Sequence, residues 1–321
     1  MARNAIFIPV CALLVGACSS GDSPRNSYEL AAQGIYAGAL SEHSEFSLVG
    51  SLNHGASLWR TNDQERLFNW SHQPGEFSEL VSASFSPDGR RAVATDPRTL
   101  VIWDTTSGEA LAYWTTPSAV LDVALVPGGR NVFMGLKDHS AVLFDAERSD
   151  HLRTFLHDGV VGSVDVSSDG KWGLTGSDDE TAVLWNLADG SAVHTFQHSN
   201  PVRVVALSGT GRYTFTAARG QPVAIWDGSE GTRLHTLSER NDGVTTARFS
   251  TDERYLLLGY VNRRIELWDV VTGQRVQRWS ADPRTAWRAS GGVTLAVGFS
   301  QSPRTFYALA GDGQLAELHR G

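Results

Sequence analysis

Three carboxylates stand in a row in the segment GSDDETAVLWN (residues 176–186): Asp178, Asp179 and Glu180. Such a run could supply oxygen ligands to Ca²⁺ or Mg²⁺, or could share a proton in general acid–base chemistry. A carboxylate metal site needs oxygens that converge from several segments, and no other segment offers a partner for this run. We therefore expect these residues to serve the fold rather than a reaction.

Other chemical sites are equally hard to assemble from this sequence. The chain has ten His, but His194 and His235 lie 41 residues apart in the similar contexts AVHTF and RLHTL, which indicates repetition rather than metal binding. No HExxH, CxxCH or GxSxG motif occurs, so the usual signatures of a zinc protease, a haem attachment site and a nucleophile elbow are missing. We expect no catalytic residue, no cofactor and no metal, and hence no enzyme.

Composition narrows the fold and the partners. The chain has 321 residues, ten of them Trp, and a net charge of −8. Short apolar runs alternate with turns rich in Gly, Asp and Ser, and helix signals are weak, which predicts an all-β protein. A nucleic-acid surface would need clustered Lys and Arg, so we expect no nucleic-acid partner.

The N-terminal residues look like a targeting signal. Arg3 precedes the apolar run AIFIPVCALLVGA (residues 5–17), which is shorter than the roughly 20 residues of a spanning helix. The end of this run, LLVGAC, resembles the lipobox of bacterial lipoproteins. The resemblance implies a signal peptide over residues 1–17, cleavage before Cys18, and attachment of lipid, including palmitate, to Cys18. An uncleaved anchor, or an ordinary signal peptide with a chance cysteine, is the alternative.

The cysteine count agrees with a lipoprotein. The only two are Cys11, in the segment to be removed, and Cys18, so a lipidated mature chain has no free thiol and no disulfide. Residues 18–27 then form the lipidated Cys and a flexible linker. In the lipoprotein family, Asp after the lipidated Cys usually retains the protein in the inner membrane. Ser19 stands there, which implies the outer membrane, facing the periplasm; the inner membrane is the alternative.

A repeat of about 41 residues organises the rest of the chain. An aromatic or apolar residue closes each repeat, and a second apolar marker lies 18 or 19 residues before it. A third marker lies 11 residues after it in six repeats. The closing residues are Trp59, Trp103, Phe144, Trp185, Trp226, Trp268 and Leu318, and the third markers are Trp70, Trp114, Phe155, Phe196, Leu237 and Trp279. Seven repeats of this length, each with four short strands, predict a propeller of seven blades.

Two of the repeats, FSPDGRRAVA with LVIWD and GSDDETAVLWN, resemble the WD-repeat family, whose members form β-propellers. The resemblance implies one domain over residues 28–321, a seven-bladed β-propeller of four-stranded antiparallel blades. The third marker is missing after Leu318. Residues 28–34 (YELAAQG) should therefore supply the outer strand of the last blade and close the ring, because an open ring would leave long unpaired edges.

The same resemblance assigns a role to the acidic run. In this family an Asp, a His, a Ser or Thr and the closing Trp form a hydrogen-bonded tetrad inside a blade. The members here would be His157, Ser177 (with Thr175 as the other available hydroxyl), Asp179 and Trp185. A buried carboxylate that accepts several hydrogen bonds is satisfied and not free for catalysis. The two carboxylates that flank it would be turn residues in solvent.

Departures from the repeat are the best functional candidates, because loops carry function on rigid scaffolds. The connection SHQPGEF (residues 71–77) gains about four residues, and SADPRTAWRASGG (residues 280–292) gains about nine, relative to the other repeats. By the family topology both lie on one face and flank the first blade. The candidate partner-binding residues are His72, Phe77, Arg263, Arg264, Arg284, Trp287 and Arg288.

Trp and Arg dominate protein interfaces, and an Arg cluster on an acidic protein favours a partner with an acidic segment. Trp287 could instead fold back on its own blade as a plug, and the sequence leaves both possibilities open. The leading hypothesis is a membrane-anchored periplasmic lipoprotein that acts as a non-enzymatic platform for protein partners in the bacterial envelope. One alternative is a propeller enzyme or small-ligand binder with its site at the mouth of the central channel. Another is a scaffold that uses several blades without one hot spot.

Overall fold

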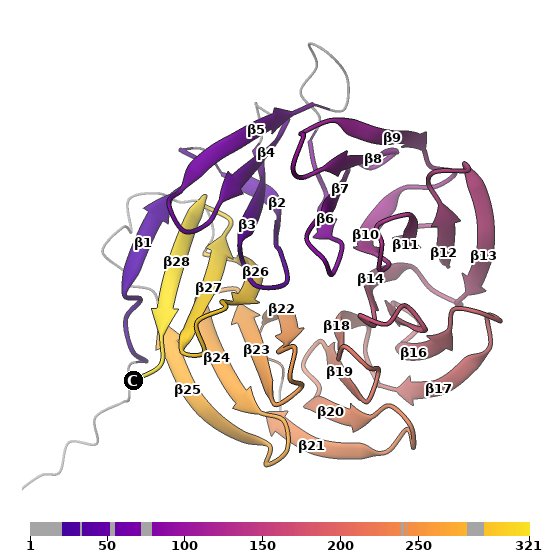
Figure 1. Ribbon diagram of the computed structural model, residues 1–321. Coiled ribbons are helices and arrows are strands. Elements are labelled where there is room, and N and C mark those ends of the chain that lie inside the picture. Colours follow the sequence, from indigo (N-terminus) through magenta and orange to yellow (C-terminus); the bar gives the residue numbers. More distant parts are fainter. Residues whose placement is uncertain are drawn as a thin grey trace, which may run out of the picture.

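The computed structural model describes residues 21–32, 34–51, 55–71, 79–238, 241, 243–280 and 292–321, and every regular element in these ranges is a β-strand. The strands form seven four-stranded antiparallel sheets that stand around a central axis like the blades of a propeller (Figure 1). The prediction of an all-β, seven-bladed propeller is confirmed. No helix in the described part of the chain is long and apolar enough to cross a membrane.

Each blade runs from an inner strand at the axis to an outer strand at the rim. Blade 1 contains β2 (Ile35–Leu40), β3 (Phe46–Ser51), β4 (Gly55–Arg60) and β5 (Glu65–Trp70); blade 2 contains β6 (Ser82–Phe85), β7 (Arg91–Thr95), β8 (Thr99–Asp104) and β9 (Ala110–Thr115). Blade 3 contains β10 (Val120–Leu125), β11 (Asn131–Leu136), β12 (Ser140–Asp145) and β13 (Asp150–Leu156); blade 4 contains β14 (Val161–Val166), β15 (Trp172–Ser177), β16 (Thr181–Asn186) and β17 (Ala192–Gln197). Blade 5 contains β18 (Val202–Leu207), β19 (Tyr213–Ala218), β20 (Val223–Asp227) and β21 (Arg233–Ser238); blade 6 contains β22 (Val244–Phe249), β23 (Tyr255–Tyr260), β24 (Arg264–Asp269) and β25 (Gln274–Ser280). Blade 7 contains β26 (Thr294–Phe299), β27 (Thr305–Ala310), β28 (Gln314–His319) and, as its outer strand, β1 (Asn26–Glu29).

The alternating strand directions give the ring two distinct faces. In blade 1 the first residue of the inner strand, Ile35, pairs with the last residue of the next strand, Ser51. The connections into the inner strands therefore share a face with the turns between the second and third strands. We call this the upper face. The lower face carries the turns between the first and second strands and between the third and outer strands.

The N-terminal strand closes the ring. β1 pairs antiparallel with β28, with Tyr28 opposite Leu315, so the first strand of the chain completes the last blade. This prediction is confirmed, but the strand begins at Asn26 and ends at Glu29, earlier than the expected residues 28–34. Contacts with the ring begin earlier still, because the Asp22 amide donates to the carbonyl of Arg278 at 2.9 Å. Contacts of the described residues with the ring therefore begin six residues before the expected boundary at residue 28.

Aromatic residues of the repeat hold neighbouring blades together. The outer-strand marker of one blade packs against the closing residue of the next: Trp70 stacks on Trp103 with ring centroids 4.9 Å apart, and Phe155 meets Trp185 at 5.2 Å. Such pairs contribute ~0.5–1.5 kcal/mol beyond the burial of their area. The fixed interval between these markers in the sequence is therefore the spacing that brings each blade into register with its neighbour.

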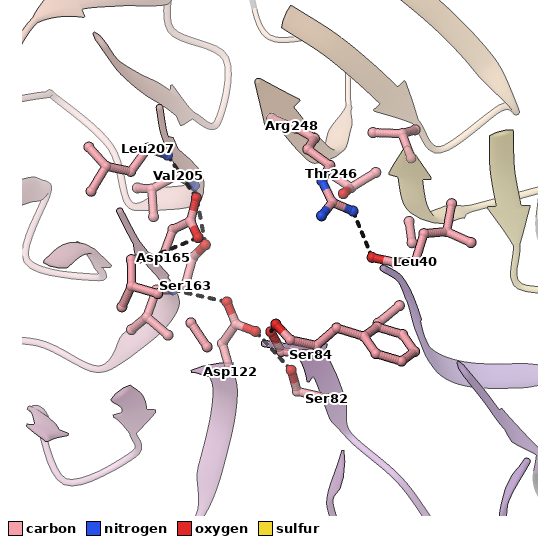
Figure 2. Close-up of a pocket in the computed structure, with 18 of the residues that line it drawn as sticks. Leu40, Ser82, Ser84, Asp122, Ser163, Asp165, Val205, Leu207, Thr246 and Arg248 are labelled. Atoms are coloured by element: carbon pink, nitrogen blue, oxygen red, sulfur yellow. Dashed lines mark hydrogen bonds between the residues drawn. The ribbon is translucent and has the colours of Figure 1, made fainter. Parts of the chain in front are cut away.

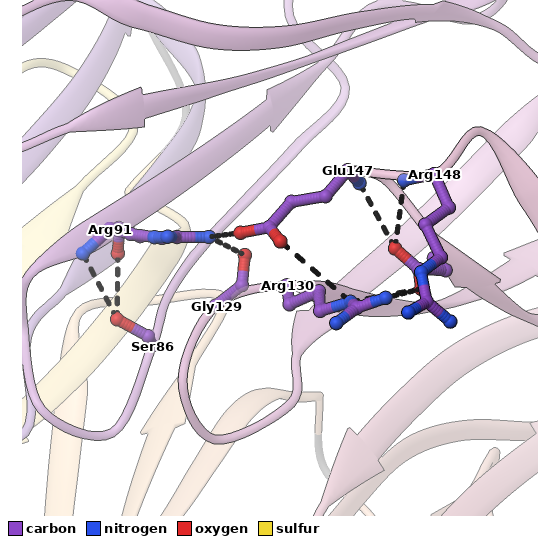
Figure 3. Close-up of polar contacts among 7 residues, drawn as sticks. Ser86, Arg91, Gly129, Arg130, Glu147 and Arg148 are labelled. Carbon is purple, nitrogen blue, oxygen red and sulfur yellow. Dashed lines mark hydrogen bonds and ion pairs between the residues drawn. The ribbon is translucent and has the colours of Figure 1, made fainter.

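Ion pairs add to these contacts on the lower face (Figure 3). Arg91 of blade 2 reaches the carboxylate of Glu147 in blade 3 at 2.9 Å and the Gly129 carbonyl at 3.3 Å. Within blade 3, the Arg130 Nε donates to Asp145 at 2.9 Å, and this guanidinium holds the pKa of Asp145 at about 2. Blades 2 and 3 are thereby joined by charge as well as by aromatic packing.

Candidate functional site

The acidic run of residues 178–180 contributes one carboxylate to a hydrogen-bonded chain inside blade 4. Asp179 Oδ2 lies 2.8 Å from His157 Nδ1, His157 Nε2 lies 2.7 Å from Thr175 Oγ1, and the Trp185 indole N–H donates to the same Oγ1 at 2.8 Å. Burial by itself would raise the pKa of Asp179, but hydrogen bonds from the Thr181 and His157 side chains outweigh it and lower the pKa. The carboxylate is ionised and fully engaged, which suits a structural role.

The hydroxyl of this chain comes from Thr175 and not from Ser177. Ser177 is the last residue of β15, next to the turn, and its Oγ accepts the Asp179 amide at 3.1 Å. Thr175 lies two residues before Ser177 in β15, farther from the turn, and its Oγ1 accepts the hydrogen bond of the Trp185 indole N–H. Asp178 is a turn residue that pairs with Arg203 at 2.8 Å on the upper face.

The closing Trp finds the same acceptor in blade 5 and a different one in blade 6. Trp226 donates to Thr216, the equivalent of Thr175, at 2.8 Å, while Trp268 donates to the buried Glu266 at 3.3 Å. Blade 5 has Gly220 where blade 4 has Asp179, and His198 Nε2 there has no hydrogen-bond partner. Burial and then Arg233 lower the pKa of His198. The indole N–H is satisfied by whichever polar side chain the degenerate repeat provides.

Two of the predicted partner-binding residues serve contacts within the ring. Arg263 forms an ion pair with Asp312 of blade 7, and its amide donates to the Gly292 carbonyl at 2.8 Å. The Arg264 guanidinium lies 3.8 Å from the ring centroid of Tyr260. Both side chains are about one-fifth exposed, and their expected role in partner binding stays a prediction. Arg263 instead fixes the point where the connection from blade 6 enters blade 7.

The other sequence candidates fall outside the described residues. These are Cys18 and the loop residues His72, Phe77, Arg284, Trp287 and Arg288. The described ends of both long connections do lie on the upper face, one between blades 1 and 2 and the other between blades 6 and 7. Inner strand β2 contacts both β6 and β26, so the two connections start on either side of blade 1.

A cavity of about 680 Å³ occupies the central channel and is lined by the inner strands of all seven blades. Asp122, Asp165 and Arg248 are half-buried charged groups that line it (Figure 2). Asp122 accepts from Ser82 Oγ at 2.8 Å and from the Val164 amide at 2.9 Å, so it links three consecutive blades. These carboxylates satisfy amides on the channel edge of the inner strands, which would otherwise lack partners.

The Arg248 side chain connects blade 6 with blade 1 across the channel. The Arg248 guanidinium donates to the Leu40 carbonyl at 2.7 Å and to Glu42 at 3.2 Å, although blade 7 lies between blades 6 and 1. Gly298 holds the equivalent place in blade 7, 20 residues before the closing residue, and an added Cβ there would collide with Ser44 and press on Leu40 of blade 1. The channel charges escaped sequence analysis. The signal was available, because Asp165 and Arg248 stand at a repeat position that is Ala or Gly in most other blades.

Asp165 is expected to titrate near neutral pH. Burial raises the pKa of its carboxyl to about 7, against the opposing effect of hydrogen bonds from the Leu207 and Val166 amides. Because this pKa exceeds the unfolded value of about 3.9, the free energy of unfolding should fall as pH rises from about 4 to about 7, with no further change above that range from this group. Carboxyl ¹³C NMR, with Asp165→Asn to assign the resonance, measures this directly. Titration near pH 4 would contradict the expectation.

Exposed apolar side chains favour the upper face. Tyr36 (56% exposed) and Leu121 (37%) stand at the channel mouth, where inner strands β2 and β10 begin. Leu156 (75%) ends β13 and Val261 (46%) follows β23, on the same face. Among the large apolar side chains exposed in the described ranges, Val271 is on the lower face and the others lie on outer strands. These residues could not be identified from the sequence, because the alternation of side chains along an inner strand does not show which of them are exposed at the upper end of the channel.

The described residues offer no group of three or more His, Cys, Asp or Glu side chains arranged to hold a metal ion.

Two segments, residues 149–186 and 231–269, match the family described as WD domain, G-beta repeat. Each match covers an outer strand and the next three strands, which is one sequence repeat offset from a blade. No curated protein matches the chain significantly. Propellers of this type commonly act as scaffolds for protein interactions. The ring of seven four-stranded blades is a β-propeller, and two of its repeats are similar to the WD domain, G-beta repeat.

Proposed function

We propose that the protein is a membrane-anchored, non-enzymatic scaffold of the bacterial envelope that binds a protein partner through its upper face. The propeller supplies a rigid platform, and a lipid on Cys18 confines it to a membrane surface that faces the periplasm. The outer membrane is the location that the residue after Cys18 favours. The partner proposed has an acidic segment, because the connection from blade 6 to blade 7 carries Arg284 and Arg288 around Trp287.

The observation that carries this proposal is the apolar channel mouth. Tyr36 exposes apolar surface on blade 1, between the two blades that the long connections enter, and Leu121 exposes apolar surface on blade 3 at the same channel mouth. Exposed apolar patches rimmed by polar groups mark interaction sites, and aromatic residues contribute most of the energy at such sites. The lower face, by contrast, presents polar turns with Asp88, Asp169 and Glu253.

A second candidate function rests on the central cavity. A volume of about 680 Å³ is within the range of small-ligand sites, and Asp122, Asp165 and Arg248 line it. The hydrogen bonds of both carboxylates to neighbouring inner strands favour a structural role for them. A small cationic ligand that is displaced by Asp165→Asn, without loss of folding, would favour this alternative.

Recovery of partners from cells is expected to depend on the upper face. Chemical crosslinking followed by purification should recover the same partner from wild type and from a lower-face control, Lys171→Ala. Recovery should fall about tenfold or more with Tyr36→Ala and Leu121→Ala combined, because two hot-spot side chains together contribute on the order of 2–4 kcal/mol. A second double variant, Trp287→Ala with Arg288→Ala, should also reduce the recovery of the partner. Unchanged recovery in both double variants would contradict the proposed partner face.

The anchor is tested by fractionation of the same cells. Cys18→Ser should move the protein out of the outer-membrane fraction, while Ser19→Ala, one residue away, should leave it there. Continued membrane retention of the Cys18→Ser protein would contradict lipidation and leave the partner face to be judged by the crosslinking result.

A further inference from the structure

The N-terminal segment leaves the propeller at the rim of blade 6. The Asp22 amide donates to the Arg278 carbonyl at 2.9 Å, and the Ser280 amide donates to the Asp22 carbonyl at 3.0 Å. The Gln277 side chain donates to the Asp22 carboxylate at 2.5 Å. Asp22 thus extends blade 6 beyond its outer strand β25, before the chain crosses to blade 7 as β1. Backbone hydrogen bonds therefore hold Asp22, close to the start of the described chain, against blade 6.

This exit point lies very close to the residue proposed to carry lipid. Cys18 is four residues before Asp22 in the sequence, and four residues span about 14 Å at most. The headgroup region on each side of a bilayer is roughly 5–8 Å deep. A propeller held at this distance brings the end of β25 on the rim of blade 6, where Asp22 contacts Arg278 and Ser280, close to the headgroups.

The rim at this point carries an excess of positive charge. Glu266, almost fully buried, is approached by Arg275 at 3.2 Å and by Arg264 and Arg278 at 3.7 Å. With the exposed Asp22 carboxylate, which accepts a hydrogen bond from Gln277, two carboxylates here face three guanidiniums. Strand β25 has two Arg and no acidic residue, and Arg25 is exposed just before β1.

The charge of the surrounding blades differs in sign from that of the whole protein. Residues 244–321, which contain blade 6 and most of blade 7, hold ten Arg against seven Asp and Glu. The whole chain has a net charge of −8. The basic part of the molecule is therefore the part to which the N-terminal tether is attached, and Val276, 37% exposed, adds apolar surface between Arg275 and Arg278.

We propose that the rim of blade 6, formed by Arg275, Val276 and Arg278, together with Arg25 on the adjoining edge of blade 7, docks on the anionic phospholipid headgroups of the membrane to which the protein is anchored. This inference rests on the proposed anchoring at Cys18. Guanidinium groups match phosphate oxygens in a bidentate geometry and are weakly hydrated, so they suit such a contact. The propeller then stands on its rim, and its upper face is directed along the membrane, open to a partner in the periplasm.

Hydrogen exchange on the full-length protein tests the orientation. Amide exchange is compared for protein in solution and protein bound to vesicles of phosphatidylcholine with phosphatidylglycerol. Vesicles should slow exchange in residues 22–29 and 271–280, and should leave the opposite rim at β13 unchanged. Protection that is uniform around the ring, or that falls on the upper face or on β13, would overturn the proposal.

Charge variants test the lipid chemistry. Arg25→Gln combined with Arg275→Gln should reduce the affinity for anionic vesicles about 25-fold, since each basic residue near an anionic surface contributes roughly fivefold. The pair Arg25→Lys and Arg275→Lys keeps the charge and should bind nearly as wild type. Arg66→Gln with Arg153→Gln, on the rims of blades 1 and 3, is the control for net charge. Arg278 is left in place so that Glu266 keeps a partner, and thermal unfolding checks each variant. Equal affinity for the Gln and Lys pairs would overturn the proposal.

Failure of this inference can be told apart from failure of the proposed function. Intact mass of the purified protein and the Cys18→Ser fractionation decide whether a lipid is attached, and crosslinking decides the partner face. The vesicle measurements use the full chain whether or not it is lipidated. A lipidated protein whose partner recovery is normal, but whose blade 6 rim stays unprotected on vesicles, would refute only the docking of the rim.

Discussion

Deleting residues 26–29 is expected to lower the free energy of unfolding by ~3–5 kcal/mol, because each lost hydrogen bond contributes ~0.5–1.5 kcal/mol and apolar burial is lost as well. The deletion removes β1, whose four residues pair with Gln314–Glu317 of blade 7. It also removes Tyr28, which packs against the apolar cluster shared by blades 1 and 7 and donates to Glu317 at 3.1 Å. The ring would then be open, with β28 as an unpaired edge strand that favours aggregation.

Urea denaturation followed by Trp fluorescence measures this effect. Tyr28→Ala should give an intermediate loss, about 1–3 kcal/mol, because the ladder remains while the ring contact is lost. Ser27→Ala is the matched control in the same strand, since its side chain is exposed and makes one hydrogen bond, to Gln314. Ring closure by β1 would be refuted if the deletion unfolded at the same urea concentration as wild type.

Asp179→Ala is expected to destabilise blade 4 by ~1–3 kcal/mol, because it leaves buried donors without an acceptor. Asp179 accepts hydrogen bonds from His157, from Thr181 and from the Asp158 amide, and His157 in turn positions the Thr175 hydroxyl that accepts the Trp185 indole. Loss of one member disturbs the whole chain of hydrogen bonds.

Asp178→Ala is the control, because it changes the adjacent carboxylate, which is partly exposed and pairs with Arg203 at the surface. An exposed ion pair of this kind contributes roughly 0–1 kcal/mol. The pKa of Asp179 is lowered in the folded state, so its contribution should be present above the unfolded pKa of about 4 and lost as pH falls below it. Equal denaturation midpoints for the two variants would contradict the structural role of Asp179.

The repeat made the architecture predictable because its markers are the contacts between blades. A Trp or Phe 11 residues after one closing residue must meet the next closing residue, as Phe155 meets Trp185, so the interval survives where other positions have diverged. The missing marker after Leu318 identified the N-terminal strand for the same reason. Asp22 escaped prediction because its contacts are made by the backbone amide and carbonyl, which any residue could provide.

The candidate site was less predictable because it depends on how blades meet. Arg263 and Arg264 stand in a turn that looks exposed in the sequence, but Asp312 of the next blade and the ring of Tyr260 occupy their guanidiniums. Thr175 and Ser177 lie on the same side of one strand, and only their depth decides which hydroxyl reaches Trp185. Contacts across blades have no fixed sequence interval apart from the repeat itself.

Site-specific photocrosslinking in living cells tests most directly whether the upper face binds a protein partner. A photoreactive residue is placed at Tyr36, on the channel mouth, or at Lys171, in an exposed turn of the lower face. Both sites lie outside the tetrad of blade 4 and on the described surface. A discrete crosslinked product at position 36, absent at position 171, is the predicted result. A product at position 171 alone, or the absence of a product at position 36, would contradict the assignment of the upper face as the partner-binding surface.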